Sequence, residues 1–213
     1  MEFPRLSTQR RALLAQAADK YSEALEGSVA AEYLAGRGIP LEVAQGFQLG
    51  YVDEPMEGHD WFKGRLAIPY LTPTGVSLIR FRSLEPDPKR KYDQEKGMRT
   101  PLFNVRDLHK SDPWVAVCEG ELDTVVMSGI VGVPAVGIPG VDHWNTNKLV
   151  WARLLQDYSA VYICLDPDDA GQKIVGDIQR LVENPVIINL PADVNDTVLT
   201  EGVDFILSKM GLD

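Results

Sequence analysis

The stretch that decides the fold is VAVCEGELD (Val115 to Asp123), together with its distant partner VYICLDPDDAG (Val161 to Gly171). Each is a short apolar run that ends in carboxylates, Glu119 and Asp123 in the first, Asp166 and Asp168 in the second. Short apolar runs bounded by turn residues are typical of buried strands in an α/β sheet. Ligands bind at the carboxyl ends of the strands in such sheets, so we expect both groups to face one crevice.

A third acidic group follows the apolar run VIINL (186–190) and contains Asp193 and Asp196. From residue 111 onward, strand-like runs alternate with helical patterns, which predicts a parallel sheet with helices on its faces. Hard divalent cations such as Mg²⁺ bind carboxylate oxygens together with water and phosphate. The pattern therefore predicts a metal-dependent phosphoryl-transfer site. A simpler interpretation stays open for single residues, because Asp123 also suits a first helical turn and the Asp166–Asp169 group could cap a helix from Ala170.

The first half of the chain has a different character. Two helices are predicted within residues 6–36, the first capped by Ser7 and ended by Gly27, the second at about Val29–Ala35. A third, short helix is predicted near Leu41–Phe47. The runs RLAIPYL (65–71) and VSLIRFR (76–82) predict a β-hairpin around the turn TPTG. Arg80 and Arg82 share one side of the second strand, which is either a solvated edge or an anion-binding surface. The polar stretch SLEPDPKRKYDQEKGMRTP (83–101) is predicted to be an extended loop.

Charge divides the chain further. The net charge is −10, but residues 61–110 carry 11 basic and 5 acidic side chains, whereas residues 111–213 carry 5 basic and 16 acidic ones. A basic patch is the electrostatic requirement for binding nucleic acid. Bound divalent cations would offset part of the acidic excess.

Several classes of protein are disfavoured. Cys118 and Cys164 lie inside predicted strands, and the three histidines are scattered, so we expect buried reduced thiols and no zinc site. No apolar run reaches the roughly 18 residues of a membrane span, and the N-terminal stretch MEFPRLSTQRR lacks the apolar core of a signal peptide. We therefore expect a cytoplasmic protein, in a bacterium or a phage-infected host, with no membrane partner.

The motifs E-G-x-x-D, D-x-D-x-A-G and D-x-N-D after successive strands resemble the Toprim domain, the metal-binding fold of DnaG-type primases, topoisomerases and certain nucleases. Upstream segments (Glu32–Val52, Gly64–Leu84 and Lys91–Asn104) resemble, in order, the N-terminal half of the DnaG primase catalytic core. The resemblance covers about Glu32 to Phe205, and the D-x-N-D form is more similar to phage helicase-primases. It implies an α/β fold with a small α+β basic subdomain (1–110) followed by a Toprim catalytic domain (111–213).

The resemblance also implies a function. The chain would be the catalytic core of a DNA primase, a nucleotidyltransferase that makes short RNA primers on single-stranded DNA from nucleoside triphosphates. Mg²⁺ or Mn²⁺ would be held by catalytic Glu119, Asp166 and Asp168, with Asp123, Asp193 and Asp196 completing a second metal position. Template or triphosphate would contact the basic residues Arg65, Arg80, Arg82, Lys89, Arg90, Lys91 and Arg106.

Some features depart from the family. We find no N-terminal zinc-binding module, no helicase-binding domain and no P-loop. A replicative helicase or a separate zinc-binding primase subunit is therefore a candidate partner. Two alternatives remain open: a Toprim-type metal-dependent nuclease, and a non-catalytic replication module that binds helicase or DNA.

Overall fold

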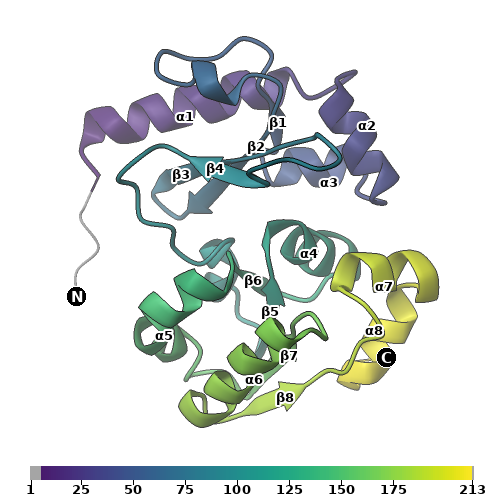
Figure 1. Cartoon of the computed structure of the whole chain (residues 1–213). Coiled ribbons are helices and arrows are strands. Elements are labelled where there is room, and N and C mark those ends of the chain that lie inside the picture. The colour runs from purple at the N-terminus through teal and green to yellow at the C-terminus, as the bar shows by residue number, and fades with distance from the viewer. Residues whose placement is uncertain (1–5, 213) are drawn as a thin grey trace. The chain divides into compact units, whose positions relative to one another are not determined.

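The computed structural model describes residues 6–212, and the chain divides into two compact units between Arg99 and Thr100 (Figure 1). Residues 1–5 of the N-terminal stretch considered above lie outside the described residues. The α/β class with a parallel sheet and flanking helices is confirmed, and an antiparallel sheet is present as well. The boundary predicted between residues 110 and 111 falls later than this division, and the assignment of the two parts to separate roles stays a prediction.

The first unit is an antiparallel sheet accompanied by three helices. The strand order is β1-β2-β3-β4, and the β2–β3 hairpin is the one predicted from the sequence. The elements are α1 (Thr8–Glu23), α2 (Val29–Gly36), α3 (Leu41–Gly46), β1 (Gly50–Tyr51), the 3₁₀ helix η1 (Asp60–Phe62), β2 (Leu66–Thr72), β3 (Gly75–Arg82) and β4 (Tyr92–Gln94).

Helix α1 begins where the sequence predicts. The Ser7 hydroxyl accepts a hydrogen bond from the Arg10 N–H at 3.1 Å, which satisfies one of the open donors of the first turn. Its buried side chains, Leu14, Ala17, Ala18 and Tyr21, recur at helical spacing. They join a core with Phe62, Ile79 and Phe81, so α1 is held by one apolar face against the sheet.

The stretch predicted as an extended loop contains a strand, β4, so that prediction is wrong in part. Arg80, Phe81 and Arg82 pair with Gln94, Asp93 and Tyr92, and β3 is consequently an interior strand. Arg80 and Arg82 are each only 8% exposed. The solvated-edge interpretation of these two arginines is therefore wrong.

The second unit is built on a parallel sheet of order β6-β5-β7-β8. The elements are the 3₁₀ helix η2 (Val105–His109), β5 (Trp114–Glu119), α4 (Glu121–Val126), the π-helix η3 (Met127–Val131), β6 (Ala135–Ile138), α5 (Val141–Leu154), β7 (Ala160–Cys164), α6 (Asp169–Leu181), β8 (Pro185–Ile187), α7 (Val194–Glu201) and α8 (Val203–Met210). The core includes Val117, Val136, Trp144, Trp151 and Ile163, all of them nearly fully buried.

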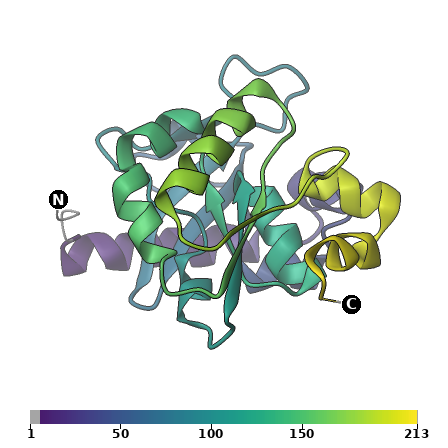
Figure 2. The same ribbon diagram turned by 90° about the horizontal axis from the view of Figure 1, so that it is seen from below.

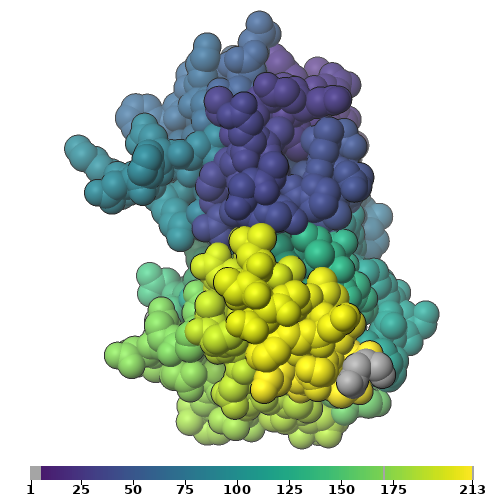
Figure 3. Space-filling view, turned by 90° about the vertical axis from the view of Figure 1, so that its right-hand side faces the viewer, coloured from purple at the N-terminus to yellow at the C-terminus, as the bar shows by residue number. Residues whose placement is uncertain are grey.

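Helices cover both faces of this sheet. Helices α5 and α6 lie side by side on one face and α4 packs on the other, with α7 and α8 outside α4 (Figures 1 and 2). The C-terminal helices, drawn in yellow, form a large part of the second unit's surface in the view of Figure 3. From β5 the chain crosses to β6 on one side and then back to β7 on the other, so the strand order reverses between β5 and β7. Ligand sites of open α/β sheets lie at such a reversal.

Three sequence-based boundaries need correction. The glycines and proline of GIPGVDHWN (137–145) predict a loop, but α5 already begins at Val141, after Gly140 at φ 113°. The pattern after the first strand predicts a helix over Leu122–Ser128, and the structure has α4 followed by the π-helix η3 there. The predicted strand VIINL is shorter, since β8 ends at Ile187. Within residues 6–212, no helix combines the length and apolar character needed to cross a bilayer.

Candidate functional site

Glu119 is the last residue of β5, at the point where the strand order reverses. Its Oε2 atom is buried and has no hydrogen-bond partner among the described residues. Burial, together with the negative charges of Asp166 and Asp168, raises the pKa of Glu119 to about 7, against an opposing backbone hydrogen bond from Asp166. A buried carboxylate with an unused oxygen requires a compensating cation or a proton.

Asp166 and Asp168 follow the neighbouring strand β7. Cys118 and Cys164 are register partners, so the carboxyl ends of β5 and β7 lie at the same edge. Asp166 is half-buried, whereas Asp168 is exposed. The Oδ1 atom of Asp168 accepts a hydrogen bond from the Gly171 N–H at 2.8 Å, so Asp168 caps α6. The capping role that the sequence leaves open for the Asp166–Asp169 group therefore falls to Asp168.

Gly171 allows α6 to begin close to Glu119. A Cβ at this position would lie 2.2 Å from the Asp166 carbonyl oxygen and 3.2 Å from Glu119 Oε2. Any side chain would therefore push the first turn of α6 away from the strand ends. The D-x-D-x-A-G motif contains this requirement, but sequence reasoning had used only its acidic positions.

A backbone hydrogen bond connects the third acidic group, which contains Asp193 and Asp196, to Asp123 of the first group. The Asn195 N–H donates to Asp123 Oδ1 at 2.9 Å, which joins α4 to the start of α7. Asp193 caps α7 by accepting from the Asp196 N–H at 2.7 Å, and Asp196 itself is exposed. Asn195 is 1% exposed and was not among the predicted site residues, although the D-x-N-D motif contains it.

Within residues 6–212, no three His, Cys, Asp or Glu side chains converge closely enough to form a ready metal site. Glu119, Asp166 and Asp168 nevertheless lie close enough for their charges to raise the pKa of Glu119. Mg²⁺ keeps several waters and needs only one or two carboxylates beside phosphate oxygens. The buried, unpaired oxygen of Glu119 beside two further carboxylates fits such a cation.

Two predicted basic residues, Arg80 and Arg82, lie together on β3. Arg80 Cζ is 4.6 Å and Arg82 Cζ is 5.1 Å from the centre of the Tyr92 ring. The Nη1 atom of Arg82 also donates to Tyr92 Oη at 2.5 Å. These arginines are consequently fixed by stacking rather than extended into solvent.

Another three predicted basic residues, Arg65, Lys89 and Arg90, line a pocket of about 1160 Å³ in the first unit. Lys91 is exposed and follows Arg90 directly. The pocket wall also includes Trp61, which is 77% exposed and was missed at the sequence level. Five carboxylates share the lining, namely Glu57, Glu85, Asp87, Asp93 and Glu95. The pocket is therefore mixed in charge.

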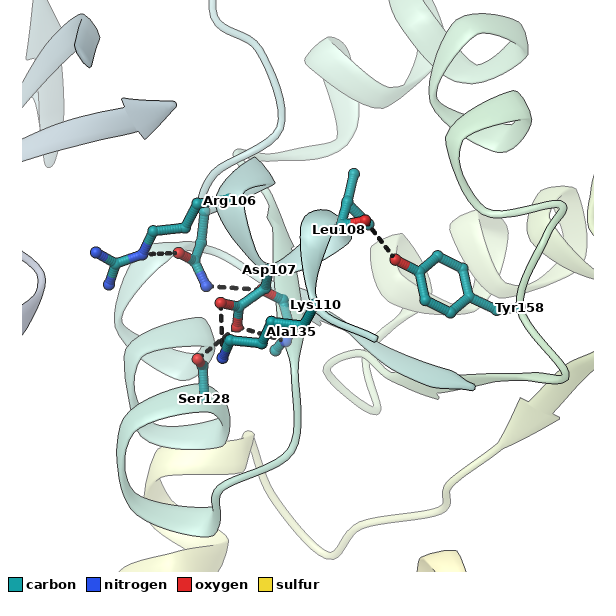
Figure 4. A network of polar contacts seen from close by, with 8 residues as sticks. Arg106, Asp107, Leu108, Lys110, Ser128, Ala135 and Tyr158 are labelled. Carbon is teal, nitrogen blue, oxygen red and sulfur yellow. Dashed lines mark hydrogen bonds and ion pairs between the residues drawn. The ribbon is translucent and has the colours of Figure 1, made fainter. Parts of the chain in front are cut away.

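Arg106 belongs to a separate polar network in the second unit (Figure 4). Its Nε atom donates to Asn104 Oδ1 at 2.9 Å, and Asn104 Nδ2 donates to the Ala135 carbonyl oxygen at 2.9 Å. Burial lowers the pKa of Arg106, and Asp107 opposes this effect. Ala135 begins β6, whereas Ile138 at its other end pairs with Glu119. This hydrogen-bond network ties Arg106 to the end of the sheet opposite the carboxylates.

The buried carboxylate of Asp107 organises the same network. It accepts from Ser128 Oγ at 2.5 Å and from the Ala135 N–H at 3.0 Å, and it forms an ion pair with Lys110 at 2.8 Å. Asn104 adopts a left-handed backbone conformation with φ 57°. Neither residue was predicted from the sequence, where both resemble ordinary turn residues.

The cysteines match expectation. Cys118 and Cys164 are free and at most 1% exposed. Burial raises the pKa of both thiols well above the usual range, with the Cys164 sulfur adding to the effect on Cys118. Both side chains are therefore uncharged core residues.

Comparison with known proteins identifies the class of fold. Residues 116–198, which lie in the second unit, match the family model described as Toprim-like. Comparison with curated proteins gives no match for this sequence.

The whole chain has the fold of a DnaG-type primase catalytic core, as the sequence motifs predicted. The zinc-binding and RNA polymerase domains of the Aquifex aeolicus primase align with a TM-score of 0.77 and 21% identity, over 99% of this chain and 63% of that one. The RNA polymerase domain of Mycobacterium tuberculosis primase DnaG aligns with a TM-score of 0.73 and 23% identity, over 96% and 84%. The primase fragment of the bacteriophage T7 primase-helicase aligns with a TM-score of 0.65 and 20% identity, over 83% and 73%.

Proposed function

We propose that this chain is the catalytic core of a DNA primase, which synthesises short RNA primers on single-stranded DNA. The observation that carries the proposal is the buried, unpaired Oε2 atom of Glu119 beside Asp166 and Asp168. It lies at the strand reversal of a fold shared with primase cores over nearly the whole chain. A DnaG primase catalytic domain of this fold has been solved bound to single-stranded DNA.

In this proposal, Glu119, Asp166 and Asp168 hold Mg²⁺ or Mn²⁺. When bound, the cation supplies the charge that activates a 3′-hydroxyl and stabilises a pyrophosphate leaving group. Asp123, Asp193 and Asp196 complete or tune a second metal position. Since Asp123, Asp168 and Asp193 each also accept a backbone hydrogen bond, their orientation is fixed before any ligand arrives.

The basic residues contact phosphate. Arg80 and Arg82 present stacked guanidinium groups, and Arg65, Lys89, Arg90 and Lys91 supply exposed or half-exposed charge near the pocket of the first unit. Such contacts position a strand or a triphosphate without reading base sequence. We retain Arg106 as a weaker candidate, because its Nε atom is engaged by Asn104.

Partners follow from the same proposal. The substrates are a single-stranded DNA template and nucleoside triphosphates. In the T7 system, a lagging-strand DNA polymerase has been solved with primase domains bound to an RNA/DNA hybrid and dTTP. A replicative helicase or a zinc-binding primase subunit on another polypeptide is the corresponding partner proposed for this chain.

The test is primer synthesis. The protein is incubated with single-stranded DNA, labelled nucleotides and Mg²⁺ or Mn²⁺, in parallel with Asp166→Asn and Asp168→Asn variants. Short products from the unmodified protein alone are expected. Extension of a supplied primer without initiation would mean that a further module is needed to start synthesis. Metal-dependent cleavage of the DNA without any need for nucleotides would instead identify a nuclease.

A binding module is the remaining alternative. DNA binding that is equal in the unmodified protein and both variants, with neither synthesis nor cleavage in any condition, would overturn the catalytic proposal.

A further inference from the structure

A column of alternating arginine and tyrosine side chains joins α2 to the antiparallel sheet. Arg37 Cζ lies 5.6 Å and Arg82 Cζ lies 5.4 Å from the centre of the Tyr33 ring. On the other side, Arg82 Cζ lies 5.1 Å and Arg80 Cζ lies 4.6 Å from the Tyr92 ring. Arg82 is thus in contact with two aromatic rings, one from a helix and one from a strand.

The charge of Arg82 has no carboxylate partner. Within residues 6–212, no Asp or Glu forms an ion pair with it, and its Nη1 atom donates to the neutral Tyr92 hydroxyl. Its side chain is nevertheless almost fully buried, with 8% exposure. A buried cation without an anion is costly, and cation–π contacts offset only part of that cost. The arrangement suits a site whose anion is supplied by a ligand.

Two polar atoms of this column are left unused. Arg82 Nε and Tyr33 Oη are both buried and make no hydrogen bond of good geometry among the described residues, although the Tyr33 hydroxyl lies close enough to Arg82 to interact with its charge. Buried polar groups of proteins are almost always paired, so an unpaired donor beside an unpaired hydroxyl requires an explanation. A phosphoryl oxygen that accepted from both groups after a small side-chain movement would provide one.

We propose that Tyr33 is a positioning residue: with Tyr92 it fixes the plane of the Arg82 guanidinium, so that Arg82 is held ready for a phosphoryl group. This inference rests on the proposed function, in which Arg82 contacts phosphate. Tyr33 lies on α2, far in sequence from every predicted site residue. The phosphoryl group belongs either to the DNA strand or to the incoming triphosphate.

The experiment compares Tyr33→Phe, which keeps the ring, with Tyr33→Leu, which removes it, in the whole chain. Tyr51→Leu, at a half-buried tyrosine of β1 in the same unit, is the matched control. Binding of fluorescein-labelled single-stranded DNA is measured by anisotropy over a range of salt concentrations. The KM for nucleotides and kcat are measured in primer synthesis or primer extension.

Loss of the ring should weaken one phosphate interaction by about three- to tenfold, the size of a partly buried cation–π contact. If the phosphate is in the DNA, Tyr33→Leu weakens DNA binding and lowers the salt slope by up to about 0.7. If it is in the nucleotide, KM rises and DNA binding is unchanged. Tyr33→Phe keeps the ring and loses only the hydroxyl, so its loss should be smaller than that of Tyr33→Leu in either case, and Tyr51→Leu should show none.

A double-mutant cycle with Arg82→Lys separates positioning from general stability. If Tyr33 acts through Arg82, Tyr33→Leu should have little further effect once Arg82 is replaced. Equal losses in both backgrounds, or unchanged binding and KM in a folded Tyr33→Leu protein, would overturn the inference. Should Tyr33→Leu fail to fold, Tyr33→Met takes its place. Absence of DNA binding and synthesis in the unmodified protein would count against the proposed function instead.

Discussion

At the scale of single residues, the charged form of the half-buried Glu119 carboxylate is disfavoured in the folded chain. Its pKa is raised from 4.5 to about 7, so the folded protein holds this proton more tightly than the unfolded one. The contribution of Glu119 to stability consequently falls as pH rises from about 4.5 to about 7, and it stays at its lowest value above that range. Removing the charge should therefore stabilise the fold, even though it also removes a proposed metal ligand.

We expect Glu119→Gln to raise the free energy of unfolding of the metal-free protein by about 1–2 kcal/mol at pH 8, with little gain at pH 4.5. Thermal unfolding in the presence of a chelator measures this effect. Glu183→Gln, at an exposed glutamate, should change nothing. A variant less stable than the unmodified protein at pH 8 would show that Glu119 is not a source of strain.

The same protonation equilibrium should control the cation binding proposed for this site. A carboxylate must lose its proton before it can bind a metal. We therefore expect the stabilisation by Mg²⁺ or Mn²⁺ to increase between pH 6 and pH 8, and to be much reduced in Asp166→Asn. The shift of the unfolding temperature with added metal gives the measurement, and stabilisation that is independent of pH would contradict the role of Glu119.

The grouping of the three carboxylates could be predicted from the sequence because each lies at or just after the end of a strand. Glu119, Asp166 and Asp168 directly follow apolar runs, and parallel strands bring their carboxyl ends to one edge. The burial of Arg80 and Arg82 could not be predicted, because it depends on β4, a three-residue strand within a polar stretch that contains proline and glycine. Tyr33, Asn104 and Asp107 were missed because their roles arise from contacts with residues distant in sequence.

At the scale of elements, the start of α6 determines how closely Asp166 and Asp168 approach Glu119. The first turn passes over the end of β7 at Gly171, where there is no room for a methyl group. Gly176 lies in the middle of the same helix, and a Cβ added there would meet only the tip of Arg180, at 3.9 Å. These two glycines therefore form a matched pair.

We expect Gly171→Ala to lower the free energy of unfolding by about 2 kcal/mol or more, because the helix start must shift. Gly176→Ala should instead raise it by about 0.5–1 kcal/mol, since alanine is the better helix former. Chemical denaturation measures both. Equal behaviour of the two variants would mean that α6 does not begin in close contact with the strand end.

At the scale of the whole molecule, the structure and the sequence place the division of the chain differently. Residues 100–110 carry little apolar periodicity, and the sequence predicts that they end the basic part. In the structure, Phe103 forms a bridge to Gly137, with N–H···O distances of 2.9 and 3.1 Å in the two directions, and Asp107 binds Ser128 and Ala135. The segment thus belongs to the second unit by its contacts.

A fragment of residues 100–213 should therefore fold on its own, and one of residues 111–213 should unfold at a temperature lower by at least about 10 °C. Trp144 and Trp151 are each 1% exposed, so their fluorescence reports burial in both fragments. Equal unfolding temperatures for the two fragments would show that residues 100–110 add nothing to this unit.

The edge strands of both sheets are too short or too well covered for a strand of a second chain to pair with them. The outer strands β1, β4 and β8 have only two or three residues each, and β6 is covered on its outer side by the bridge from Phe103. Long, exposed outer strands are the usual template for edge-to-edge aggregation. At high protein concentration, the sheets of neighbouring chains should therefore not pair with one another, and the backbone hydrogen-bonding groups of this chain stay paired within its own fold.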